Sequence, residues 1–155
     1  SLKFNLMEHT ESNKDHKYVK DGPWSELYVL TEHWKSDLEF YKDDLRFLHH
    51  LIDKYFMWIT KPENLDMVKE LKVGLFDLKN KCQDLLEKVQ RHRTQLGQMV
   101  EDYKKADASI IIREHEHLEE EVAHFVTLFR SNRKEAFAIT EFIIDRESLA
   151  NLMDH

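Results

Sequence analysis

The sequence predicts an all-α fold, an elongated antiparallel up-down-up three-helix bundle with coiled-coil-like heptad packing. The composition is the first observation behind this prediction. With only three glycines and two prolines in 155 residues, and 34% charged residues, the chain has few turns and a large solvated surface. The second observation is an apolar residue at every seventh position, with another three residues later, in three separate stretches. We expect residues 22–155 to form one bundle, preceded by a polar N-terminal arm over residues 1–21.

The first helix is expected over about residues 24–59. Asp21, Gly22 and Pro23 precede it as a break followed by a residue suited to a first helical turn. A short turn around Pro62 then leads to the second helix, and so short a connection predicts antiparallel neighbours. The first heptad seam consists of Trp24, Leu27, Thr31, Trp34, Leu38, Tyr41, Leu45, Leu48, Ile52, Tyr55 and Ile59.

The second helix is expected over about residues 65–103 and carries the strictest repeat. Its seam consists of Val68, Leu71, Leu75, Leu78, Cys82, Leu85, Val89, His92, Leu96, Met99 and Tyr103. His92 is the one ionisable imidazole in that seam. Gly74 and Gly97 lie inside the helix, where each costs about 1 kcal/mol relative to alanine, and we interpret them as sites of close packing or a gentle bend.

The third helix is expected over about residues 108–149, with Asp107 as its N-terminal cap. Its seam contains two polar residues, of which Asn132 is interpreted as setting the register. The seam consists of Ile111, His115, Leu118, Val122, Phe125, Phe129, Asn132, Ala136, Ile139 and Ile143.

Charge and motif content narrow the classes of function. The net charge of −7, with acidic and basic residues interspersed, disfavours binding to nucleic acid or to an anionic membrane surface. The chain has no stretch of about eighteen apolar residues and no recognisable signal peptide, which predicts a cytoplasmic protein without a membrane span. The lone Cys82 occupies a buried seam position. No nucleophile triad or phosphate-binding loop is identifiable, so we expect neither an enzyme nor a cofactor.

Histidines gather toward one end of the predicted bundle. Antiparallel pairing places His92 and His115 in adjacent layers together with Trp34, and His33 is next to Trp34 in the chain. Three imidazoles from three helices could ligate zinc or iron. The alternatives are that buried histidines hydrogen-bond to neighbours and fix the register, or that they titrate near neutral pH as a pH-sensitive layer.

A second group of candidate ligands lies on the third helix. Glu114 and His117, followed by Glu121 and His124, repeat a Glu-x-x-His spacing that resembles the ligand motif of ferritin-like di-iron proteins. That family places the motif on two different helices pointing into the core, whereas both copies here share one helix, beside the core. Hemerythrin-like iron sites spread their ligands over four helices, and three are predicted here. We therefore interpret this run as a solvated face, with a metal-binding bundle as the alternative function.

A second apolar stripe on the first helix predicts an interface. It consists of Phe40, Phe47, Leu51 and Trp58, and the C-terminal half of the third helix adds Phe137 and Phe142. One apolar face is sufficient for a helix in a three-helix bundle, so a second face indicates a further partner. We expect a homodimer, or a complex with another helical protein, as the basis of function. The alternative is that a wide core accommodates these side chains.

The segment Trp34–Phe47 reads Trp-Lys-Ser-Asp-Leu-Glu-Phe-Tyr-Lys-Asp-Asp-Leu-Arg-Phe. This segment resembles a W-x3-L-x-F-Y-K-[DE]-[DE]-L pattern of uncharacterised bacterial all-helical proteins. The resemblance covers the first helix and implies a helical-bundle family, with no known activity attached.

Overall fold

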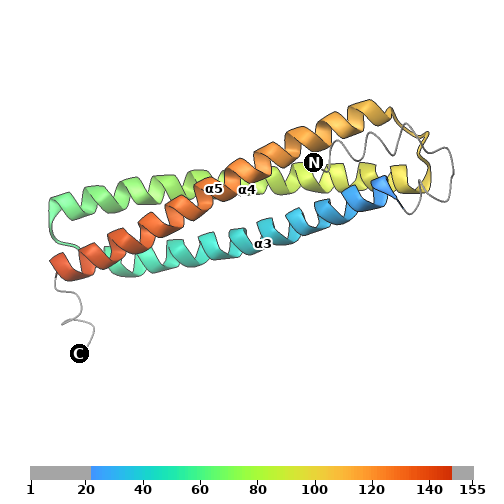
Figure 1. Ribbon diagram of the computed structural model, residues 1–155. Helices are drawn as coiled ribbons and strands as arrows, with labels where there is room; N and C mark the ends of the chain where they lie inside the picture. Colours follow the sequence, from blue (N-terminus) through green and yellow to red (C-terminus); the bar gives the residue numbers. More distant parts are fainter. Residues whose placement is uncertain (1–21, 148–155) are drawn as a thin grey trace. The chain divides into compact units, whose positions relative to one another are not determined.

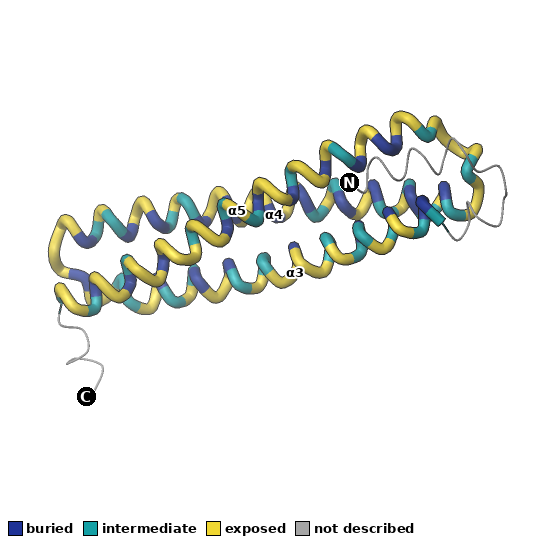
Figure 2. The backbone as a smooth tube through the Cα atoms, viewed as in Figure 1, coloured by how far each residue is buried: buried dark blue, intermediate teal, exposed yellow. Residues whose placement is uncertain are grey.

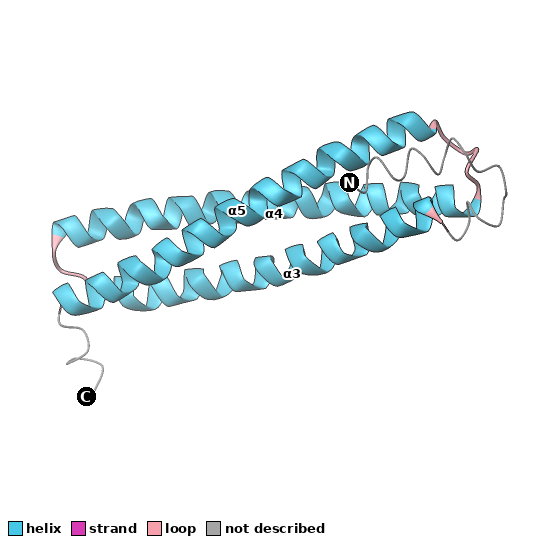
Figure 3. Cartoon of the chain, in the orientation of Figure 1, coloured by secondary structure: helices cyan, strands magenta, loops and turns pink. Residues whose placement is uncertain are grey.

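The computed structural model describes residues 22–147, so the predicted arm over residues 1–21 and the segment 148–155 lie outside the described residues. Three helices make up most of the described chain: α3 (Pro23–Phe56), α4 (Pro62–Glu101) and α5 (Ala108–Arg146) (Figure 1). Short turns join them, and residues 22–147 contain no strand (Figure 3). The predicted all-α three-helix fold is confirmed.

The helices begin where the sequence places starting signals. Pro23 and Pro62 are the first residues of α3 and α4, the position at which a missing backbone N–H is harmless. Asp107 precedes α5, and its Oδ1 accepts hydrogen bonds from the backbone N–H of Ser109 at 2.9 Å and from the Ser109 hydroxyl at 2.7 Å. These bonds lower the pKa of the Asp107 carboxyl. The predicted cap is confirmed.

Four helix boundaries differ from the prediction by two or three residues. α3 ends at Phe56 instead of residue 59, because the N–H groups of Trp58 and Ile59 bond to carbonyls only three residues back. Ile59 is nevertheless 8% exposed, so its seam position is buried outside the helix. α4 begins three residues early and ends at Glu101, and α5 ends at Arg146. A heptad pattern identifies the residues that face the core, and such residues also occur in turns.

The described residues group into two compact units, each containing part of every helix. The first unit comprises residues 22–39 and 84–123. Its apolar core joins α3 to both other helices and consists of Trp24, Leu27, Leu96, Met99, Ile111 and Ile112. In this unit α4 and α5 are antiparallel, because Lys88 pairs with Glu121 while His92, further along α4, meets His115, earlier in α5.

The second unit comprises residues 40–83 and 124–147. The Tyr41 ring packs on Phe129 and Phe125, with ring centroids 4.5 and 6.1 Å apart. Here α3 and α5 run in the same direction, because Asp44 pairs with Arg133 while Thr60, beyond α3, bonds to Glu147, beyond α5. α4 runs oppositely to both in this unit.

The three predicted seams form the buried faces of the helices. Every seam residue within the helices is buried or half-buried, including the polar Thr31, His92 and His115 (Figure 2). The Thr31 hydroxyl donates a hydrogen bond to the Leu27 carbonyl oxygen at 2.8 Å. Asn132 similarly donates from Nδ2 to the Leu128 carbonyl oxygen at 2.9 Å. The heptad pattern therefore predicted the core of both units.

The Glu147 carboxylate, directly after α5, forms hydrogen bonds to the segment between α3 and α4 and to the first turn of α4. The heptad pattern does not indicate these bonds. Glu147 accepts hydrogen bonds from the Thr60 hydroxyl, the Lys61 backbone N–H and the Asn64 amide, at 2.8, 3.0 and 2.8 Å. These bonds, led by that of Asn64, lower the pKa of Glu147 to about 2. The turn between α3 and α4 is thereby bonded to the residue that follows α5.

The two helical glycines differ in the space around them. A Cβ on Gly97 would meet the Tyr28 ring at 3.5 Å, an ordinary contact, whereas a Cβ on Gly74 would meet Asn132 Oδ1 at 3.3 Å. We therefore expect Gly97→Ala to raise the free energy of unfolding by about 0.5–1 kcal/mol through helix propensity. Gly74→Ala should gain less, because Asn132 must shift. Urea unfolding of the two variants beside the parent measures the difference, and an equal gain for both would contradict this interpretation.

Candidate functional site

Two histidines meet inside the first unit. His92 Nε2 lies 2.9 Å from His115 Nδ1, and both residues are only 4% exposed. The Trp34 ring stacks on His115, with centroids 4.7 Å apart and an interplanar angle of 27°. The sequence predicted that these three residues share neighbouring layers, and the structure confirms that they meet. His33, the third imidazole of the candidate metal cluster, is exposed.

The outer nitrogens of this pair lack partners. A neutral imidazole has one N–H and one bare nitrogen, so the mutual bond leaves His92 Nδ1 and His115 Nε2 as one donor and one acceptor. Both atoms are buried and accept or donate no hydrogen bond of normal geometry within the described residues. An unsatisfied buried polar group costs about 1–3 kcal/mol. Two buried imidazoles therefore stabilise the fold less than apolar side chains would at the same positions.

Both imidazoles are held in their neutral forms. Burial lowers the pKa of His92 to about 4, and the nearby Gln95 side chain partly opposes this shift. Burial also lowers the pKa of His115 to about 4, assisted by the charge of His92 when that ring is protonated. At pH 7 the pair therefore carries no charge, and its nitrogens are available as hydrogen-bonding groups.

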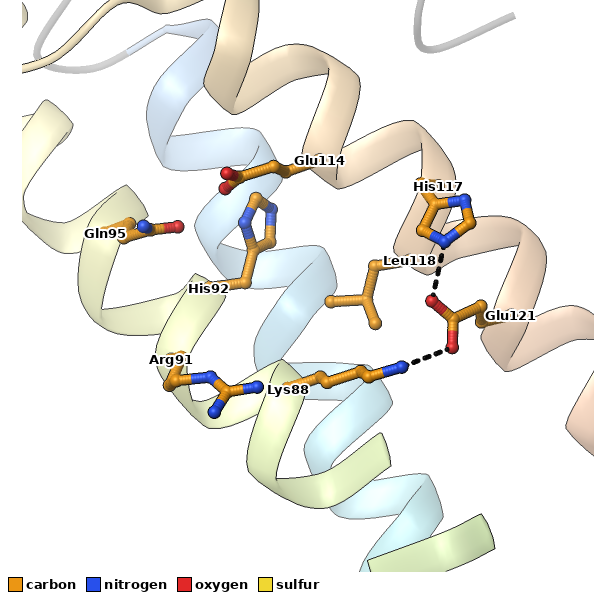
Figure 4. A pocket seen from close by; sticks show the side chains of 8 residues that line it. All are labelled: Lys88, Arg91, His92, Gln95, Glu114, His117, Leu118 and Glu121. Carbon is orange, nitrogen blue, oxygen red and sulfur yellow. Dashed lines mark hydrogen bonds and ion pairs between the residues drawn. The ribbon is translucent and has the colours of Figure 1, made fainter. Parts of the chain in front are cut away.

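A pocket of about 350 Å³ opens beside His92 in the first unit (Figure 4). We call it the His92 pocket. The α4 wall presents two cations, an amide and the His92 imidazole, and the α5 wall presents two carboxylates, an imidazole and one apolar side chain. The pocket is lined by Lys88, Arg91, His92, Gln95, Glu114, His117, Leu118 and Glu121.

The α5 wall contains three of the four Glu-x-x-His residues. Glu121 accepts hydrogen bonds from Lys88 Nζ and lies against His117 Nε2, both at 3.0 Å (Figure 4). Glu114 borders the same pocket, whereas His124 is an exposed residue of the second unit. Within residues 22–147, no group of three or more histidine, cysteine, aspartate or glutamate residues is arranged to hold a metal ion.

The residues of the predicted interface lie in the second unit, where most of them are exposed. Phe40 is 65% exposed, Phe47 51% and Trp58 47%, while Leu51 is half-buried. Phe40, Phe47 and Leu51 follow an i, i+7, i+11 spacing and therefore share one side of α3. Trp58 follows α3 in the turn. The monomer core does not accommodate these aromatic rings.

Phe137 and Phe142 lie on different sides of α5. Phe137 shares the side of Arg133, whose guanidinium lies 4.8 Å from the Phe137 ring centroid and whose Nε is 2.7 Å from Asp44 of α3. Phe142 is five residues further on, which turns it about 140° around the helix axis at about 100° per residue. Arg146 lies over the Phe142 ring at 4.9 Å. Only Phe137 therefore faces the side of α5 nearest to α3.

Four of the six predicted interface residues form one surface, which we call the aromatic flank: Phe40, Phe47 and Leu51 on α3, and Phe137 on α5. Phe47 follows Asp44 by three residues, and Phe137 follows Arg133 by four. Because α3 and α5 run in the same direction in this unit, the ion pair of Asp44 with Arg133 places Phe47 and Phe137 at the same level. An exposed apolar surface of this kind is typical of an interaction site.

The lone cysteine is a packing residue. Cys82 is 0% exposed, and burial raises the pKa of its thiol to about 11. A thiol in this state is a poor nucleophile. The sequence-based interpretation of Cys82 as a small buried seam residue is confirmed.

Sequence reasoning did not single out the α4 wall of the His92 pocket. Lys88, Arg91 and Gln95 precede or follow His92 by four, one and three residues. They occupy ordinary polar positions of a heptad repeat, and their only signal was helical proximity to a buried histidine.

Comparisons of this chain with models of protein families, with curated proteins and with solved structures find no match. Among the described helices, none has a segment long and apolar enough to cross a membrane. The candidate functions therefore depend on the geometry of the His92 pocket and the aromatic flank.

Proposed function

We propose that this chain is a non-enzymatic, cytoplasmic helical protein that acts through protein-protein contacts, and that its aromatic flank pairs with the flank of a second copy. The exposure of Phe40 and Phe47, at 65% and 51%, supports this proposal most directly. Exposing two phenylalanine rings on one helix face forgoes the roughly 1.5–3 kcal/mol that each would gain by full burial. A partner recovers that free energy.

The spacing of the flank suits a second copy of the same helix. Residues at i, i+7 and i+11 form a short heptad stripe, the pattern by which helices pair in coiled coils. In a twofold arrangement the same patch serves on both protomers. Antiparallel pairing of two α3 helices, centred between residues 45 and 46, would bring Phe40 of each copy opposite Leu51 of the other, with both Phe47 rings near the centre. The neighbouring ion pair of Asp44 with Arg133 would then lie at the polar rim.

Multi-angle light scattering of the purified parent and the Phe47→Asp variant tests this proposal. We expect the parent to be dimeric and the variant to be monomeric, because a carboxylate at the centre of an apolar interface is desolvated without a partner. Circular dichroism should show unchanged helicity, since the Phe47 side chain is half exposed in the monomer.

Two matched controls locate the interface. Phe76→Asp alters an α4 phenylalanine that is 54% exposed, and Phe142→Asp alters the opposite side of α5. Both should leave the dimer intact, whereas Phe137→Asp should weaken it. A monomeric parent at all concentrations, or equal dissociation by Phe76→Asp and Phe47→Asp, would refute pairing through the aromatic flank.

A further inference from the structure

The His92 pocket has walls of opposite charge. Lys88 and Arg91 lie on α4, while Glu114 and Glu121 lie on α5 (Figure 4). Lys88 and Glu121 neutralise each other at 3.0 Å. Arg91 and Glu114 form no ion pair with any residue in the described part of the chain. We propose that this pocket binds a small zwitterionic molecule of the free amino-acid class, with its carboxylate toward Arg91 and its ammonium group toward Glu114.

The buried histidine pair supplies an independent reason for a polar ligand. His92 is 4% exposed, lines the pocket and has an Nδ1 without a hydrogen-bond partner of normal geometry in the described residues. Its Nδ1 is a donor in one tautomer of the pair and an acceptor in the other. A carboxylate satisfies the donor and an ammonium group satisfies the acceptor. Gln95 lies beside His92 in the pocket lining, and a zwitterion that displaces the Gln95 side chain complements either tautomer.

Size and polarity restrict the ligand further. A volume of about 350 Å³ is near the lower end for small-molecule pockets. Leu118 is the one apolar side chain of the lining, so a short aliphatic side chain on the ligand would find a contact there. Carboxylate recognition by the planar guanidinium of Arg91 is the strongest single interaction available to such a molecule.

The probe is L-leucine, titrated at pH 7 into the isotopically labelled chain and followed by amide and imidazole chemical shifts. Two matched probes keep its carbon skeleton: 4-methylpentanoate lacks the ammonium group, and 3-methylbutylamine lacks the carboxylate. We expect saturable shifts at His92, Gln95 and Leu118 with L-leucine, and a dissociation constant higher by about tenfold or more for either matched probe, since each loses one charge-assisted interaction.

Neutral variants test the two walls. Arg91→Gln and Glu114→Gln should each weaken L-leucine binding by about tenfold or more. The control variants Arg113→Gln and Glu119→Gln alter exposed α5 residues outside the pocket lining and should bind as the parent does. Heteronuclear spectra establish that each variant is folded.

Three results would overturn the zwitterion proposal, and each differs from the others. Absence of saturable shifts with L-leucine would overturn the proposal, as would equal affinity for 4-methylpentanoate, which would indicate a simple anion site. Zinc chloride is titrated in parallel, and shifts at His92 and His117 with zinc but not with L-leucine would overturn it in favour of a metal site. The aromatic flank and the pocket lie in different units, so failure of one proposal leaves the other unaffected.

Discussion

The folded chain loses stability steeply as the pH falls from about 6.5 to about 4, because His92 and His115 are buried as neutral rings. The unfolded chain binds protons at these imidazoles near the ordinary pKa of 6.5, whereas the folded chain binds them only near 4. Within this window the unfolded state holds more protons, so falling pH favours unfolding. Each imidazole lowers the free energy of unfolding by roughly 3 kcal/mol as the pH falls across the full window. The stability is fully present above pH 6.5.

Urea unfolding at successive pH values between 7 and 4 measures this loss. The double variant His92→Leu with His115→Leu removes both buried imidazoles and both unpartnered nitrogens, and replacing both partners of a polar pair by apolar groups is often neutral or stabilising. We expect this variant to retain most of its stability at pH 4.5, with a shallower dependence on pH than the parent.

The charged groups around the pair remain in both proteins. Lys88 and Arg91 on α4, and Glu114 and Glu121 on α5, are present in both the parent and the variant, so the comparison isolates the buried histidine pair. His50→Gln removes an exposed imidazole and should follow the parent curve. If the double variant and the parent lose stability in parallel from pH 6.5 to 4, the buried pair is not the origin of the acid sensitivity.

Truncation of Phe125 to alanine should lower the free energy of unfolding by about 3–5 kcal/mol, the range for removing a buried phenylalanine ring. Phe125 is 2% exposed and packs against Tyr41 of α3 and Phe129 of its own helix, with ring centroids 6.1 and 6.2 Å away. Its removal leaves a cavity in the core of the second unit, and aromatic neighbours on two helices cannot close that cavity without shifting.

Phe76→Ala is the matched control for this truncation. The Phe76 side chain is 54% exposed on α4, and surface substitutions usually change stability by about 0.5 kcal/mol or less. Urea unfolding at pH 7 compares the two variants at equal protein concentration. A loss below about 1 kcal/mol for Phe125→Ala would show that the second unit is packed more loosely around this ring than its burial indicates.

The sequence predicted the core because heptad periodicity is a local property of helices. Leu38, Leu75 and Phe125 could be assigned to buried faces by counting residues, without knowing what packs against them. The helix start at Pro23 was similarly readable from backbone chemistry, whereas α4 begins at Pro62, three residues before the expected start near residue 65. The ends of α3 and α5 were not, because turn and terminal hydrogen bonds to Tyr55, Phe56 and Glu147 decide where regular helix stops.

The candidate sites show the limit of such counting. Periodicity placed Phe40, Phe47 and Leu51 on one side of α3, and it identified His92 and His115 as buried. The apolar composition of the C-terminal half of α5 grouped Phe137 with Phe142, although five residues separate them and the helix turns them to different sides. Periodicity also overlooked Arg91, whose importance arises only from its place across a pocket from Glu114.

Sequence alone therefore determined which stretches are helical and which faces are buried, because both follow from interactions within a few residues along one chain segment. Only the tertiary structure decided that His92 and His115 bond to each other beside Trp34, that Glu147 fastens the turn before α4, and which aromatic rings share a surface. Those contacts join residues far apart in the chain. Their geometry depends on how each helix is rotated about its own axis and shifted along it relative to its neighbours.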